Sequence, residues 1–321
     1  MDWHADRWHE VGASGMINRA FIATTTLLLQ IVPRVFATDR LALKGGTAIN
    51  LYLDDAPRLS VDLDLVFTQL GLPREDALSA INDEMRRIAA ALSADGLQVR
   101  TAVAAELGET GLVVSDGTAQ VKVETNVVFR GTLLETVTRS LSAGAEEWLG
   151  MDAPAIVLDR SEVFAGKFMA ALDRQHPRDL YDVWRLYEHG PIEPGMLAAF
   201  VIYLCGHNRP AHEVLNSPER VLGEDYDRAL VGMIRGEVPT LGALLESRAQ
   251  LRRDIAQGLA DSDRAFLSGF FNCEPDWSLL AYPQANELPA LAWKQRNLEI
   301  FRTKRPDEFA RQHALLAQIL A

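Results

Sequence analysis

The chain has 321 residues, of which 48% are hydrophobic and 24% charged, and its formal net charge is −12. These values are typical of a folded globular protein and exclude a long disordered or low-complexity chain. The acidic balance also argues against a protein that coats nucleic acid through a broad basic surface, while a local pocket for one RNA end or nucleotide stays compatible with it.

Cysteines and apolar segments set the expected compartment. Cys205 and Cys273 form no CxxC pair, which predicts no thiolate zinc site and fits a reducing cytosol. Acidic residues precede any apolar run at the N-terminus, which is wrong for a signal peptide. The apolar segment 20–36 is shorter than a bilayer span of about 20 residues, so we interpret it as a core helix. We therefore expect a cytoplasmic protein with no membrane partner.

Hydrophobic periodicity predicts an α/β half followed by a helical half. In chain order it predicts a helix over 14–36 with Ser14 as N-cap, a strand over 40–44, a helix over 47–53, a strand over 59–67, a helix over 73–95, strands over 97–104, 111–116 and 119–129, and helices over 159–173 and 177–190. From 193 onward the pattern is mostly helical. The fold class is α+β, with domains over 1–150 and 151–321 joined near 145–158.

Two features near residue 50 have side chains or backbone groups that could bind a ligand or a metal ion. Gly45 and Gly46 separate a strand from a helix, where glycine permits close approach of a ligand and free N–H groups favour phosphate oxygens. Most glycine pairs are simple turns, and that reading stays open. Asp62 and Asp64 lie on the same face of the apolar strand 59–67, together with Ser60. Their oxygens suit Mg²⁺, with a solvated strand face as the alternative.

Two later segments offer candidate partners. Glu124 lies on the polar face of strand 119–129 and would supply a third carboxylate if this strand lay beside the Asp62 strand; Lys122 on the same face could instead pair with a cross-strand acid. Lys167 and Arg174 share a face of helix 159–173. Salt bridges from Lys167 to Asp182 and from Arg174 to Asp179 would explain that segment structurally, and a lysine held near an acid could also grip a triphosphate.

Taken together, these motifs resemble those of a known family. The segments LKGGTAINLY (43–52), RLSVDLDL (58–65), EVFAGKFMAALDR (162–174) and RDLYD (178–182) resemble the AbiEii nucleotidyltransferase toxins of type IV toxin–antitoxin systems. That family has a version of the DNA polymerase beta-like nucleotidyltransferase pattern. The resemblance covers residues 40–190 and implies a polymerase-beta-like mixed sheet followed by a helical domain that completes the active-site cleft.

The resemblance also implies a role for each motif residue. Asp62, Asp64 and Glu124 would hold Mg²⁺, with Mn²⁺ as an alternative ion. The implied nucleotide contacts are Gly45, Gly46, Thr47, Ser60, Lys167, Arg174 and Asp179. Asp182, or Asp179, would complete the catalytic set with Asp62, Asp64 and Lys167. Many family members have serine after the first glycine, where this chain has Gly46 followed by Thr47, so Thr47 would supply the hydroxyl.

The implied reaction is transfer of a nucleoside monophosphate from a nucleoside triphosphate to an acceptor hydroxyl. The family implies a tRNA 3′ end as acceptor, a block of translation, and an antitoxin encoded by an adjacent gene. Two alternatives remain at this stage: nucleotidylation of a small molecule, as in antibiotic-modifying relatives, and an inactive fold that serves as a nucleotide-binding interaction module.

Overall fold

A computed structural model describes residues 17–104 and 108–321, and the predicted N-cap Ser14 lies outside these ranges. The strands are β1 Leu41–Lys44, β2 Asp62–Phe67, β3 Gln98–Ala104, β4 Gly108–Ser115, β5 Gln120–Asn126, β6 Val137–Arg139 and β7 Ala155–Val157. The helices before the last strand are α1 Arg19–Val35, α2 Gly45–Thr47, its π-helical continuation η2 Ala48–Leu53, α3 Arg74–Ala94 and α4 Ala143–Leu149. The later helices are α5 Arg160–Asp173, α6 Pro177–His189, α7 Pro194–Gly206, α8 Ala211–Leu215, α9 Gly223–Ala229, η3 Val231–Met233, α10 Leu241–Gly258, α11 Asp261–Phe271, η4 Trp277–Leu279, η5 Pro283–Glu287, α12 Pro289–Lys304 and α13 Pro306–Leu320.

The strands form one mixed sheet in the order β3-β4-β5-β2-β1-β7-β6. β2 lies inside it, antiparallel to β1 and parallel to β5. The sequence did not predict β6 or β7, because each has only three residues and too few positions for a pattern of alternation. β7 pairs with β1 in parallel, with Val157 opposite Leu43. The predicted α+β class is confirmed.

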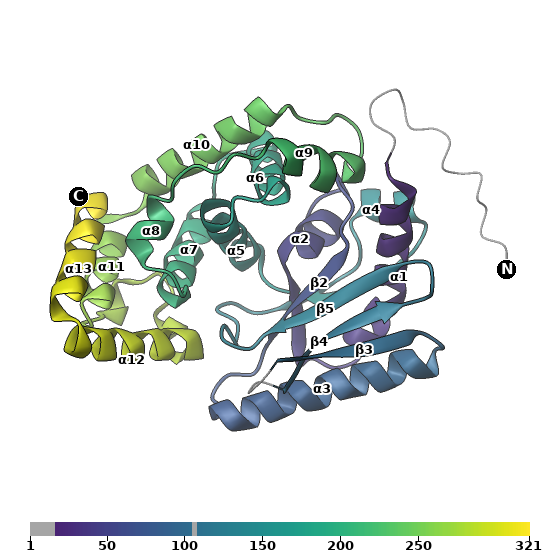
Figure 1. Cartoon of the computed structure of the whole chain (residues 1–321), viewed down its shortest axis with the longest axis horizontal. Helices are drawn as coiled ribbons and strands as arrows, with labels where there is room; N and C mark the ends of the chain where they lie inside the picture. Colours follow the sequence, from purple (N-terminus) through teal and green to yellow (C-terminus); the bar gives the residue numbers. More distant parts are fainter. Residues whose placement is uncertain (1–16, 105–107) are drawn as a thin grey trace.

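Helices α1 and α3 pack against the sheet, and Figure 1 shows α3 running along strands β3 and β4. Strand β5 alternates between exposed and buried residues along its whole length. Val121 and Val123 are fully buried, while Lys122 and Glu124 are exposed on the opposite face. The predicted alternation is therefore confirmed, and one face of β5 stays open for polar side chains.

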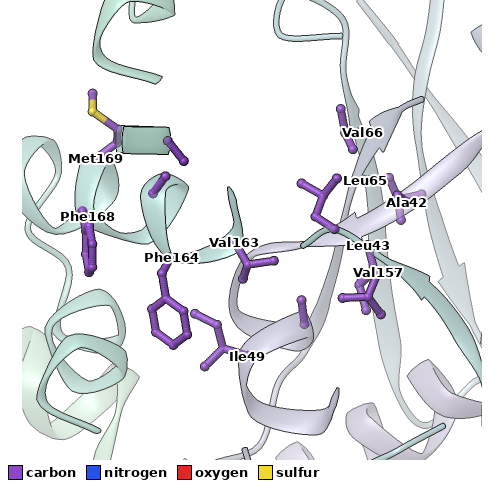
Figure 2. Packing of buried hydrophobic residues seen from close by; sticks show 14 of the residues in the cluster. Ala42, Leu43, Ile49, Leu65, Val66, Val157, Val163, Phe164, Phe168 and Met169 are labelled. Atoms are coloured by element: carbon purple, nitrogen blue, oxygen red, sulfur yellow. The ribbon is translucent and has the colours of Figure 1, made fainter. Parts of the chain in front are cut away.

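The helices that follow β7 pack against the strand-bearing part through several helices, among them α5 and α6. Phe164 of α5 lies beside Ile49 of η2 in the buried cluster (Figure 2). Behind this contact, a single apolar cluster continues from the sheet into the helices α6, α7, α10 and α11. The predicted boundary at residue 150 stays a prediction, since α5 and η2 share a core across it. In the part of the chain that the structure describes, no helix is both long and apolar enough to span a bilayer.

Candidate active site

The pairing of β2 with β5 brings the three predicted acids together. In the parallel register Asp62 is opposite Lys122, and Asp64 is opposite Glu124. Neighbouring strands lie about 4.8 Å apart, so these side chains share one patch of the sheet. The side chains of Asp62 and Glu124 are 44% and 49% exposed, so a ligand can reach them.

The patch carries more negative than positive charge at its centre. Burial raises the pKa of Asp62, and the nearby carboxylates of Asp64 and Glu124 raise it further. Two cations partly offset this charge. Arg178 of α6 lies 3.8 Å from the Asp62 carboxylate, and Lys122 binds Glu124 at 2.6 Å on the same strand. Lys122 therefore forms its ion pair with Glu124 of its own strand, and not with an acid of a neighbouring strand.

Gly45 and Gly46 make room for two functional side chains. Gly45 has a φ of +73°, and a Cβ there would lie 2.7 Å from the Asp64 carboxylate. A Cβ on Gly46 would lie 2.7 Å from the Arg58 guanidinium. Any larger residue would displace one of these groups, because real Cβ contacts are longer than this. The glycine pair, which directly follows β1 and begins α2, therefore does more than change the chain direction.

Thr47 and Ser60 have hydroxyl partners inside the protein. Their Oγ atoms lie 2.7 Å apart, and both residues are buried. Thr47 also donates to the backbone carbonyl of Asp62, and Thr25 of α1 donates to the Ser60 carbonyl at 2.8 Å. These bonds tie the start of β2 to helices α1 and α2, and they fix the position of the Asp62 backbone.

Lys167 of α5 and the acids of α6 form a buried ion cluster. The Lys167 Nζ lies 2.8 Å from a carboxylate oxygen of Asp179 and 2.8 Å from one of Asp182. Arg174 binds Asp179 as well, at 2.6 Å, while its own side chain is 62% exposed. Burial alone would raise the pKa of Asp179, but Lys167 and Arg174 outweigh it and hold this pKa well below its usual range. Both salt bridges expected from the sequence are therefore present.

Asp182 accepts hydrogen bonds from a second set of donors. Arg58, which precedes β2, binds it through Nε at 2.8 Å and Nη2 at 2.7 Å, a bidentate geometry. Asn50 of η2 donates to it at 3.0 Å. Burial opposes ionisation of Asp182, but Arg58 and Lys167 lower its pKa. The cluster joins the loop before β2, helix η2, α5 and α6.

Sequence reasoning did not assign Arg58 or Arg178 to the site. Arg58 is 2% exposed and buried with Asp182, and Arg178 faces Asp62. A signal for Arg178 was available: it follows Pro177 in the first turn of α6, where a cation opposes the helix dipole. An arginine placed there indicates an anion supplied by another element. Arg58 carries no comparable signal.

The described residues hold no ready-made group of three histidine, cysteine or acidic side chains arranged around a metal ion. In this structure the Glu124 carboxylate is paired with Lys122. Asp62 and Asp64 remain as adjacent oxygen donors. Mg²⁺ commonly binds through one or two carboxylates and completes its shell with water and substrate phosphate, so the donor set on β2 fits such an ion.

Comparison with known proteins gives the family. The family described as nucleotidyl transferase AbiEii toxin, type IV TA system, matches residues 26–296. The sequence has no match among curated proteins. The structure is similar to MenT4, a nucleotidyltransferase toxin from Mycobacterium tuberculosis, with 17% identity and a TM-score of 0.54 over 92% of this chain and 93% of that one. It is also similar to JHP933 from Helicobacter pylori, with 13% identity and a TM-score of 0.42 over 74% of this chain and 94% of that one. The match over most of its length shows that the chain belongs to the AbiEii family of nucleotidyltransferase toxins of type IV toxin–antitoxin systems.

Proposed function

We propose that the protein transfers a nucleoside monophosphate from a nucleoside triphosphate to the 3′ hydroxyl of an RNA, most simply a tRNA, in a reaction that depends on Mg²⁺. The observation that carries the proposal is the β2–β5 register, which gathers Asp62, Asp64 and Glu124 on one accessible patch opposite Arg178. The patch offers oxygen donors for a divalent ion and a cation for phosphate within a few ångströms of each other.

Asp62 and Asp64 would hold the metal ion, and Glu124 would join them after release from Lys122. When bound, Mg²⁺ would neutralise phosphate charge and activate the attacking oxygen; Mn²⁺ offers the same chemistry. The fit rests on electrostatics: burial, and after it repulsion from Asp64 and Glu124, raises the pKa of Asp62, and a divalent cation would stabilise the charged carboxylates. In the reaction, the acceptor hydroxyl gives up its proton to solvent and its oxygen forms a bond to the α-phosphorus. The bond between that phosphorus and the oxygen that bridges it to the β-phosphorus breaks, and pyrophosphate leaves.

The nucleotide phosphates would be bound by Arg174 at the end of α5 and Arg178 in the first turn of α6. Arg178 contacts Asp62, and the pKa of Arg174 is raised by its hydrogen bond to Asp179 and also by the Asp64 carboxylate. Arginine presents a planar fork that suits phosphate oxygens. Gly45 and Gly46 remain proposed phosphate contacts through their backbone N–H groups.

We assign Lys167, Asp179 and Asp182 to positioning rather than to direct substrate contact. The Lys167 side chain is only 5% exposed and already has two carboxylate partners. Contact with a phosphate would break buried ion pairs, and an unpaired buried charge costs several kcal/mol. Thr47 and Ser60 are assigned in the same way, because their hydroxyls bind each other.

The test is transfer of labelled nucleotide by the purified full-length protein. Each of the four labelled triphosphates is incubated with total RNA and Mg²⁺, and labelled tRNA is resolved on a gel. Asp62→Asn should abolish labelling, while Asp83→Asn, an exposed acid of α3, should leave it unchanged. Absence of label in any RNA with every triphosphate would refute the RNA acceptor. Growth inhibition by the wild type that persists in Asp62→Asn would refute catalysis as the cause of toxicity, and suppression by the neighbouring gene product would support the antitoxin.

A further inference from the structure

A second concave site lies among the C-terminal helices. It is a cavity of about 380 Å³ lined by the α7–α8 connection and by helices α11, α12 and α13. Figure 1 shows these helices gathered at one end of the molecule. Val128, from the loop that follows β5, also lines it. A volume of this size accommodates a small organic group rather than a single ion or water molecule.

Two routes through the protein connect this cavity to the catalytic acids. Along the chain, Val128 follows Glu124 by four residues, and four trans peptide units span at most about 15 Å between Cα atoms. Through contacts, His207 of the cavity wall lies 3.5 Å from Asp173, the neighbour of Arg174. A chain of a few nucleotides can cover such a distance, so one polymer strand can reach both sites.

The loop after β5 is held at the cavity rim by close packing. The Phe129 ring lies against Tyr203, with ring centroids 4.4 Å apart. It also lies so near Gly206 that a Cβ there would approach the ring to 2.6 Å. The end of β5 is therefore fixed to α7, and the distance between the acids and the cavity is set by packed structure.

The cavity wall includes one lysine, Lys294, whose ammonium group is held by the protein. Lys294 donates to the carbonyls of His207, Asn208 and Arg209 at 2.7, 3.3 and 3.3 Å, so its ammonium group is committed to the end of α7. Burial lowers the pKa of His207 and of His212, which favours their neutral forms. None of the described residues that line the cavity is a carboxylate. These features disfavour a cation as ligand and fit a neutral ring that belongs to an anionic strand.

The remaining lining suits a flat ring with polar edges. Trp293 is 54% exposed, which offers a free aromatic face, and Phe271 and Phe301 add apolar surface. Asn208, Asn297 and Gln312 supply amide donors and acceptors. Aromatic stacking combined with hydrogen bonds to ring edges is how proteins bind unpaired nucleobases.

We propose that this cavity binds an unpaired nucleobase of the acceptor RNA strand, close to the 3′ end whose hydroxyl enters the catalytic patch. The proposal rests on the proposed function, in that it takes RNA as the acceptor. Arg209 binds Asp173, the residue before Arg174, and its side chain is 36% exposed, so it can also contact a phosphate of the connecting strand. The base enters the cavity, and the backbone stays outside it near Arg209.

The test measures binding without catalysis. The full-length Asp62→Asn protein is titrated into a fluorescently labelled single-stranded RNA of about ten nucleotides, a length within the usual footprint of single-strand binders, and anisotropy gives the Kd. Adding Trp293→Ala should raise the Kd roughly 5- to 150-fold, the loss expected for one base–aromatic stack. Ile300→Ala, at an exposed apolar position of the same helix outside the cavity lining, is the control and should leave the Kd unchanged.

Other outcomes separate the two proposals. An equal Kd for the Trp293→Ala and Ile300→Ala proteins, or no RNA binding at all, would overturn the cavity proposal, even if the wild type labels tRNA. A specific loss on Trp293→Ala would support it, even if no triphosphate is transferred. In the catalytically intact background, Trp293→Ala should raise KM for RNA while leaving KM for the triphosphate unchanged, and Asn297→Ala should act in the same direction; a change confined to the triphosphate KM would also overturn it.

Discussion

Removal of one charge from the buried cluster should separate the aspartates of this site into two kinds. Asp182 accepts two bonds from Arg58 and one from Asn50, and it contacts the Lys167 ammonium at 2.8 Å. Asp182→Asn would leave two buried cations with Asp179 as their remaining buried acid. Breaking a buried pair by removing one partner costs about 3–5 kcal/mol. Since a typical domain has about 5–15 kcal/mol of stability in total, we expect a protein that is folded but markedly easier to unfold.

Asp62→Asn should not lower the stability of the protein, in contrast to Asp182→Asn. Asp62 is 44% exposed, and its pKa is raised by burial and by two neighbouring carboxylates. For an acid, a raised folded-state pKa means that ionisation is less favourable in the folded than in the unfolded protein, so the charge destabilises the fold above the unfolded pKa. The amide removes this effect. Asp62→Asn should therefore keep or slightly raise stability while it abolishes nucleotide transfer.

The assay is urea unfolding followed by circular dichroism for the wild type and both variants at neutral pH without Mg²⁺. A shift of the midpoint at constant slope measures the change in stability alone. We expect the Asp182→Asn midpoint to fall strongly and the Asp62→Asn midpoint to stay or rise. An unchanged midpoint for Asp182→Asn, or a loss in Asp62→Asn as large as in Asp182→Asn, would refute the division into a positioning acid and a metal-binding acid.

Three further outcomes follow from the geometry. Gly45→Ala should lower kcat roughly 100-fold, because the added methyl group displaces the Asp64 carboxylate. The control is Gly71→Ala, also at positive φ (+77°) but in open space, which should retain activity and cost only about 1 kcal/mol of stability. Equal kcat values for the two variants would contradict this. Burial raises the pKa of Glu162 to about 7, so stability should fall by roughly 3 kcal/mol as pH rises from 4.5 through 7, and Glu162→Gln should lose this slope in urea midpoints measured at pH 5 and pH 8. Lys122→Ala should change the free energy of unfolding by no more than about 1 kcal/mol, since the pair of Lys122 with Glu124 is half-exposed. The same variant should bind Mg²⁺ more tightly in a calorimetric titration, and weaker binding would exclude Glu124 as a ligand.

Strands could be predicted from the sequence only where the alternation of apolar and polar residues was long enough to recognise. The strand at residues 59–67 and the alternation at 119–129 have enough positions to show which side chains share a face. Neither pattern says which strands are neighbours, so the alignment of Asp64 with Glu124 had to come from the sheet order. The three-residue strands β6 and β7 were missed because no periodicity can be read in them.

Partner choice in the ion cluster was predictable only where residues lie close in sequence. Arg174 and Asp179 are five residues apart, and Lys167 and Asp182 lie on consecutive helices, so both pairs followed from local spacing. Arg58 is 124 residues from Asp182, and nothing in its local context indicates burial. The need for glycine at position 46 was hidden for the same reason, since the side chain that fills the space is Arg58.

Helix α6 contributes residues both to the buried ion cluster and to the patch of acids on the sheet, and the helical repeat explains how. Successive residues of an α-helix are about 100° apart, while residues three apart share a face. Asp179 and Asp182 therefore both enter the buried cluster, and Arg178, the residue before Asp179, projects toward Asp62. One turn of helix thus supplies the cluster that fixes α6 and the arginine that faces the acids. A change in the buried cluster should therefore affect catalysis by moving Arg178. In the folded fraction of the Asp182→Asn protein, we expect KM for the triphosphate to rise by a larger factor than kcat falls.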